Sequence, residues 1–113
     1  MVESLHAGLA AGRWTELTLA EQLANIGSEV GRAVRAKSTG NEQRMTAAMG
    51  RALELFELTL ADVRWQGRRR ELCRAREVIC DFLVGDNVCG STAASFDAYF
   101  LPFTIAARAH RWT

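Results

Sequence analysis

The residues of this chain whose types and spacing could support chemistry are arginines gathered in one short segment. Six of the 14 basic residues lie between positions 64 and 76, and a tryptophan stands among them. A guanidinium group offers paired donors that match phosphate oxygens, and an aromatic ring can stack on a nucleic-acid base. We therefore predict a nucleic-acid-binding surface made of Arg64, Trp65, Arg68, Arg69, Arg70 and Arg74.

The position of these arginines is unusual for a helix. Arg68, Arg69 and Arg70 fall at the start of a predicted helix, where the backbone dipole favours acidic residues, so helix stability does not explain them. A second interpretation is that the arginines meet carboxylates of their own or a neighbouring subunit, with Glu54, Glu57 and Asp62 as partners. Trp65 likewise has two interpretations, as a stacking platform or as a side chain packed at the end of the fold.

Arg76 belongs to a different setting from the other arginines. It follows Leu72 by four residues and precedes Ile79 by three, which places it at the edge of an apolar helix face. A guanidinium buried there requires a carboxylate partner. We expect a structural, buried ion pair between Arg76 and one of three glutamates: Glu29, Glu54 or Glu57.

The patterns that would indicate catalysis or a metal centre are missing from the sequence. The two histidines, His6 and His110, do not belong to a Glu-x-x-His pair of the kind found in di-iron bundles. Cys80 or Cys89 could pair with His110 as a nucleophile, but nothing in the sequence positions a third, orienting group. The arginine–histidine spacing of helical-bundle ribonucleases is also missing, because Arg108 and His110 are two residues apart and do not share a helix face. We expect no metal, no cofactor and no enzymatic activity.

Length and composition predict one soluble globular domain covering residues 1–113. Apolar residues make up 49% and charged residues 24%, and the net charge of +1 means that any anion site must be a local cluster. Three cysteines, none in a CxxC pair, and no secretory leader favour a cytoplasmic, reduced protein without membrane association. We interpret Cys73 and Cys80 as small core residues, because they share a helix face and lie too far apart to bridge.

Helical periodicity runs through most of the chain. Thr18 and Glu21 form a capping box, and apolar residues then recur every three or four positions, as in an amphipathic helix. Short turns separate this helix from three more, and Pro102 should kink or split the last one. We predict an all-α, antiparallel up-down-up-down four-helix bundle with a short N-terminal arm packed through Trp14. The helices are expected at about 18–37, 42–60, 68–84 and 92–110.

A strip of small residues on the first helix bears on assembly. It consists of Ala20, Ala24, Gly27 and Gly31. A glycine inside a helix costs roughly 1 kcal/mol relative to alanine, so either another backbone approaches closely there or the poor propensity is tolerated. Together with the many aromatic residues of the last helix, this strip predicts a homo-oligomer.

Four long segments carry a resemblance to known proteins. They are LTLAEQLANIGSEVGRAVR (17–35), RALELFELTLAD (51–62), RAREVICDFLVGDNVCGS (74–91) and YFLPFTIAAR (99–108), and they resemble a widespread group of small helical bacterial proteins of about this length. In size, helix count and basic flank, the chain is also similar to the four-helix-bundle accessory proteins of diversity-generating retroelements. That second likeness is architectural, and it implies a ring-like oligomer that binds RNA beside a reverse transcriptase.

These observations lead to two expected functions. The first is a non-catalytic, oligomeric accessory protein that binds RNA or DNA, or a nucleic-acid enzyme such as a reverse transcriptase, through the arginine surface. The alternative is a protein–protein interaction scaffold whose arginines form salt bridges between subunits.

Overall fold

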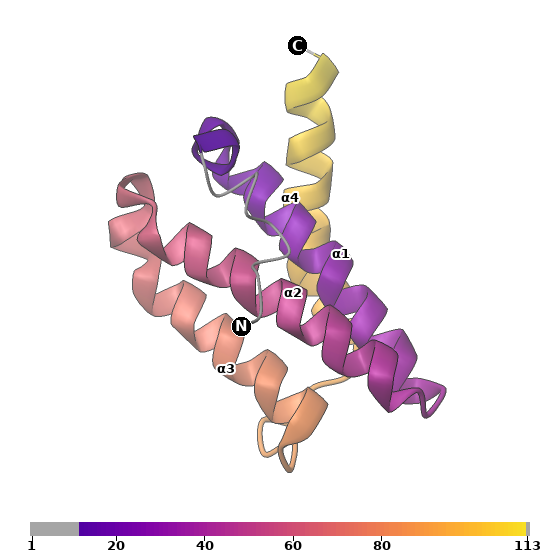
Figure 1. Ribbon diagram of the computed structural model, residues 1–113. Coiled ribbons are helices and arrows are strands. Elements are labelled where there is room, and N and C mark those ends of the chain that lie inside the picture. Colours follow the sequence, from indigo (N-terminus) through magenta and orange to yellow (C-terminus); the bar gives the residue numbers. More distant parts are fainter. Residues whose placement is uncertain (1–11, 113) are drawn as a thin grey trace.

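The computed structural model describes residues 12–112, apart from the side chains of Arg111 and Trp112. Throughout this range the regular elements are helical (Figure 1). A short 3₁₀ helix, η2 (Trp14–Glu16), precedes α1 (Leu19–Ser38) and α2 (Glu42–Ala61), and a second one, η3 (Val63–Arg68), leads into α3 (Arg69–Val84) and α4 (Ala93–Trp112). The long helices begin and end within two residues of the predicted positions.

Helix α1 is the centre of the packing. It lies between α2 and α4, and α2 in turn packs on α3, with neighbouring helices antiparallel (Figure 1). The predicted all-α, antiparallel four-helix bundle with a short N-terminal segment is therefore confirmed. Among the described residues, none of the helices is both long and apolar enough to cross a membrane.

The start of α1 and its buried face follow from the sequence pattern. Thr18 Oγ1 accepts the backbone N–H of Glu21, and Glu21 Oε1 accepts that of Thr18, which is the expected capping box. Burying an amphipathic stripe is the main source of stability for such a helix. The apolar residues of α1 that fill the core are Leu19, Leu23, Ile26, Val30, Ala33, Val34 and Ala36.

The segment before α1 is anchored by Trp14. Its ring is 1% exposed, and its Nε1–H donates to Thr59 Oγ1 of α2 at 3.1 Å. A buried indole needs such a partner for its N–H group. The expected packing of the arm through Trp14 is confirmed.

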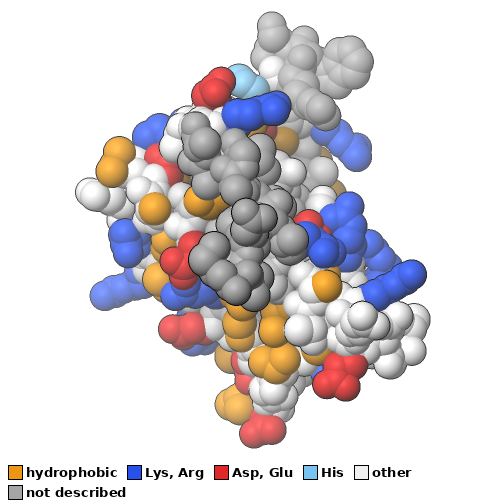
Figure 2. Space-filling view, in the orientation of Figure 1, with side chains coloured by type: hydrophobic (Ala, Val, Ile, Leu, Met, Phe, Trp, Pro, Cys, Tyr) orange, Lys and Arg blue, Asp and Glu red, His pale blue; other side chains and the backbone are white. Residues whose placement is uncertain are grey.

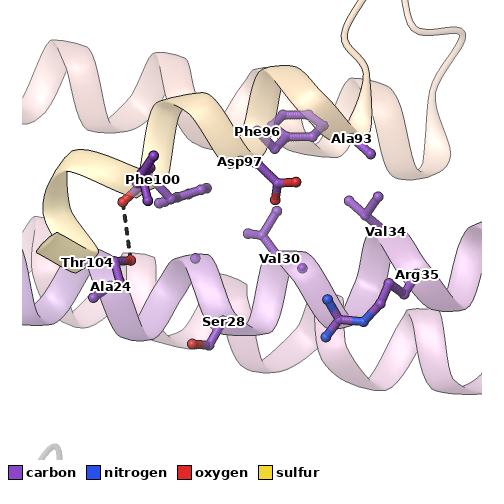
Figure 3. A pocket seen from close by; sticks show the side chains of 13 residues that line it. Ala24, Ser28, Val30, Val34, Arg35, Ala93, Phe96, Asp97, Phe100 and Thr104 are labelled. Atoms are coloured by element: carbon purple, nitrogen blue, oxygen red, sulfur yellow. Dashed lines mark hydrogen bonds between the residues drawn. The ribbon is translucent and has the colours of Figure 1, made fainter.

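The small-residue strip of α1 contacts the protein's own last helix. A Cβ atom built on Gly27 would lie 2.7 Å from Cγ of Phe100, so the glycine is needed for close packing rather than merely tolerated. Figure 3 shows α4 lying along α1 at this place, beside a hollow of about 320 Å³. Phe100 of α4 covers Gly27 within the same chain. Gly27 therefore no longer supports the predicted contact between subunits.

Helix α4 also differs from expectation at its proline. It continues as one helix from Ala93 to Trp112 with Pro102 inside, so of the two expected effects, a kink or a split, the split does not occur. Its start is capped reciprocally, because Thr92 Oγ1 accepts the N–H of Ser95 and Ser95 Oγ accepts the N–H of Thr92.

Candidate nucleic-acid interface

Arg64, the first of the predicted binding residues, lies in an internal network. Its Nη2 and Nε atoms donate to the Asp62 carboxylate at 2.7 and 3.0 Å, and Nη2 also donates to the carbonyl oxygen of Leu17 at 2.8 Å. The hydrogen bond from Arg64 is the largest of the causes that lower the pKa of Asp62 to about 2, and the same bond raises the pKa of Arg64. The guanidinium thus has its charge compensated within the fold.

Gln22 completes this network from α1. The residue has no exposed surface, and its Nε2 donates to the carbonyl of Trp14 at 2.9 Å and to Asp62 Oδ2 at 3.1 Å. Its Oε1 accepts the indole N–H of Trp65 at 3.0 Å. Sequence reasoning missed Gln22. The available signal was its position three after Leu19 and four before Ile26, on the apolar face of the helix.

Trp65 is partly buried and packs against the core. The Arg64 guanidinium carbon lies 4.5 Å from the ring centroid, a cation–π geometry. With its N–H bonded and a cation over one face, this ring matches the packing interpretation better than that of a free stacking platform.

Arg68 and Arg69 are exposed but tethered. Arg68 pairs with Glu71 at 2.9 Å, and the other oxygen of Glu71 accepts the Tyr99 hydroxyl at 3.0 Å. Burial, followed by the Glu71 hydrogen bond, raises the pKa of Tyr99 to about 12. Arg69 Nη1 donates to the carbonyl of Leu60 in the last turn of α2 at 2.9 Å. A cation is favourable at a helix C-terminus, which accounts for one of the arginines placed at the start of α3.

Arg70 and Arg74 are the members of the predicted set whose guanidinium groups have no partner within residues 12–112. Both are exposed, and neither has an ion pair or hydrogen bond within the described range. Residues four apart share one face of a helix, so α3 presents these two guanidinium groups to solvent together.

Arg76 has its partner among the expected glutamates. Its Nη1 lies 3.0 Å from Glu57 Oε1, with the two side chains 31% and 73% exposed. The pair is therefore on the surface, and the expectation that it would be buried is wrong. Glu29, another of the three candidates, instead binds Arg32 and Arg51.

The cysteines considered as nucleophiles differ in their surroundings. Burial raises the pKa of the Cys80 thiol, which disfavours the reactive thiolate, whereas Cys89 is exposed. Cys73 and Cys80 are half-buried, close to the core positions predicted for them. His6 lies outside the described residues, and within residues 12–112 there is no group of three or more potential metal ligands.

Comparison with known proteins returned no match: no protein-family model, no curated protein and no solved structure is similar to this chain. The structure shows the coarser part of the resemblance, a small all-helical protein of four helices. Membership of a particular family stays a prediction.

Proposed function

We propose that the protein is a non-catalytic helical bundle that binds RNA through the solvent-facing side of α3. The observation that carries this proposal is the pair Arg70 and Arg74, whose charges are not compensated within the described fold. Arg68 and Arg69 flank this pair, and each keeps several of its five N–H donors beyond those used internally.

This interface is smaller than the one predicted from sequence, because Arg64 and Trp65 are held in the network around Asp62. A surface of this kind contacts phosphates and carries little sequence specificity. Assembly into a homo-oligomer would multiply it, and the proposed context is an accessory role beside a nucleic-acid enzyme such as a reverse transcriptase.

The test is the binding of a labelled structured RNA, and of DNA of the same sequence, across a salt series. The logarithm of the association constant should fall linearly with the logarithm of the salt concentration. Replacing both Arg70 and Arg74 by Gln should reduce that slope by about 2, since each lost phosphate contact removes about 1. Arg108→Gln, an exposed arginine on α4, is the matched control and should leave the slope unchanged. Weak binding that does not vary with salt would reject the proposal.

A second candidate function, a protein-interaction scaffold, is favoured by a different observation. Leu101 and Ile105 are 56% and 59% exposed and lie four apart on α4. Exposed apolar pairs on one helix face are typical of interfaces. Replacing both by Ser should then lower the molar mass measured by light scattering on a sizing column. An unchanged mass, or a monomeric parent protein, would exclude these residues from a subunit interface.

A further inference from the structure

A second set of arginines lines a groove beside the turn that joins α1 and α2, at the opposite end of this helix pair from Asp62. The groove lies between the last turns of α1 and the first turns of α2, with a volume of about 540 Å³. Arg32 and Arg35 border it from α1, and Arg44 and Arg51 from α2. Figure 2 shows Lys and Arg side chains gathered on the right of the view, above the connection between these helices.

The groove has an excess of positive charge. One carboxylate, that of Glu29, serves two of the arginines, binding Arg32 Nη1 at 3.1 Å and Arg51 Nε at 3.0 Å. Four arginines less one glutamate give a local charge of +3, against +1 for the whole chain. Arg35 and Arg44 are exposed, and within residues 12–112 no carboxylate pairs with them.

Two of the four arginines are held in place by a buried carboxylate. Glu29 is 8% exposed and binds the guanidinium groups of Arg32 and Arg51. The connection between the helices is short, with Gly40 at a φ of 74° and the Asn41 side chain capping α2. Basic groups mounted on two rigid helices bind an anion with little loss of conformational entropy.

The rest of the lining indicates which part of a ligand could be recognised. It consists of small or short polar residues, with no aromatic or large apolar side chain to hold a base or an acyl chain: Ala36, Thr39, Asn41, Ala47 and Ala48. Each guanidinium has five N–H donors, and Arg32 and Arg51 each use one for Glu29. Linked phosphates present more oxygens than a single phosphate, and they can reach guanidinium groups on both helices.

We propose that this groove binds a pyrophosphate or longer linked-phosphate group of a small ligand. Free inorganic polyphosphate and the phosphate tail of a nucleotide share this chemistry. The groove is lined by residues of α1, of α2 and of the turn between them, and it shares no residue with the proposed RNA-binding surface on α3.

The sequence contained a signal for this site that was not used. Arg32 and Arg35 lie three apart near the end of one helix, and Arg44 and Arg51 lie seven apart near the start of the next. A turn of a few residues between antiparallel helices brings such pairs together.

The experiment is titration of the protein with inorganic pyrophosphate, tripolyphosphate, orthophosphate and ATP, followed by calorimetry and by backbone amide NMR shifts. We expect saturable binding of pyrophosphate and tripolyphosphate, weaker binding of orthophosphate, and shifts centred on residues 32–51. Replacing both Arg35 and Arg44 by Gln should weaken pyrophosphate binding at least about tenfold, because hydrogen bonds to charged groups are lost. Arg108→Gln serves as the control for a general loss of charge, and circular dichroism verifies folding.

The outcomes separate the two ligand sources and decide the proposal. Equal affinity for tripolyphosphate and ATP identifies the phosphates as the whole recognition element, whereas tighter binding of ATP identifies a nucleotide. The proposal is overturned if pyrophosphate binding does not saturate, or if Arg108→Gln weakens that binding as much as the double variant does. It is also overturned if the amide NMR shifts lie outside residues 32–51. RNA binding through Arg70 and Arg74 can fail or succeed independently of these results.

Discussion

The two ends of the α1–α2 pair use the same residue type in opposite ways. At one end Arg64 meets the buried carboxylate of Asp62, which Gln22 also binds, and its charge serves the fold. At the other end Arg35 and Arg44 border a groove, and the nearby carboxylate of Glu29 is engaged by the other two arginines, Arg32 and Arg51. The number of arginines in a segment therefore says little about an anion site. The decisive quantity is how many carboxylates the fold brings to the same place.

The strongest test of this comparison removes the Asp62 carboxylate, which compensates the charge of Arg64. Asp62→Ala leaves the donors of Gln22 and Arg64 without their acceptor and should lower the free energy of unfolding by about 3 kcal/mol. Urea denaturation measures the loss, with Asp86→Ala at an exposed site as the control. Equal stability of the two variants would show that the network contributes nothing.

Helix α1 extends from one end of the pair to the other, and α4 packs closely against it at Gly27. The second test removes this close packing. Gly27→Ala would place a methyl group 2.7 Å from Phe100 Cγ and should destabilise the fold by about 2 kcal/mol. Gly50→Ala on α2 is the matched control. Its Cβ would meet nothing within 4 Å, so the better helix propensity should stabilise the protein by about 1 kcal/mol. A stabilising Gly27→Ala would contradict the close packing of α4.

The pH dependence of stability sharpens the comparison further. The pKa of Asp62 is about 2 in the fold, below its ordinary value of 3.8, so the ionised form stabilises the folded state. This contribution, about 2 kcal/mol, is fully present above pH 4 and is lost as the pH falls from about 4 to 2. Thermal unfolding of the wild type and of Asp62→Asn should therefore converge in this range. Parallel curves would refute the assignment.

The smallest expected effect contrasts one arginine from each end. Arg64→Gln removes the charged partner of Asp62 and a bond to the Leu17 carbonyl, and should cost about 1.5 kcal/mol. Arg44→Gln at the groove should change stability by no more than about 0.5 kcal/mol. Chemical denaturation of both variants measures the difference. A larger loss for Arg44→Gln would reverse the roles assigned to the two ends.

Local rules were sufficient to predict the helices. The Thr18–Glu21 capping box, the apolar spacing of α1 and the short turn after this helix depend on residues close in sequence, and each is present in the structure. Close packing at Gly27 was one of two alternatives that the sequence left open, and the contact comes from the Phe100 side chain of α4 rather than from another backbone.

The candidate site could be predicted only in part, because charge compensation depends on residues distant in sequence. Asp62 was among the expected carboxylate partners of the arginines, but the sequence did not show that it would bind Arg64, or that Gln22, 40 residues before Asp62, would hold it in place. Arg69 appeared misplaced at a helix start because its function is to cap the preceding helix. Conversely, the groove arginines are separated by the connection between α1 and α2, and no single window of sequence contains an obvious cluster.

The network around Asp62 also has a consequence for the order of folding. Its long-range hydrogen bonds join residues 40 to 47 positions apart, whereas the other end of the α1–α2 pair is closed by a turn of a few residues. Closing a short loop costs less entropy, so α1 and α2 should associate first at the turn and close the network last. Contacts that form after the transition state act mainly on the unfolding rate. We therefore expect Arg64→Gln to accelerate unfolding in stopped-flow experiments while leaving the folding rate nearly unchanged, which would make this network the element that sets the lifetime of the folded state.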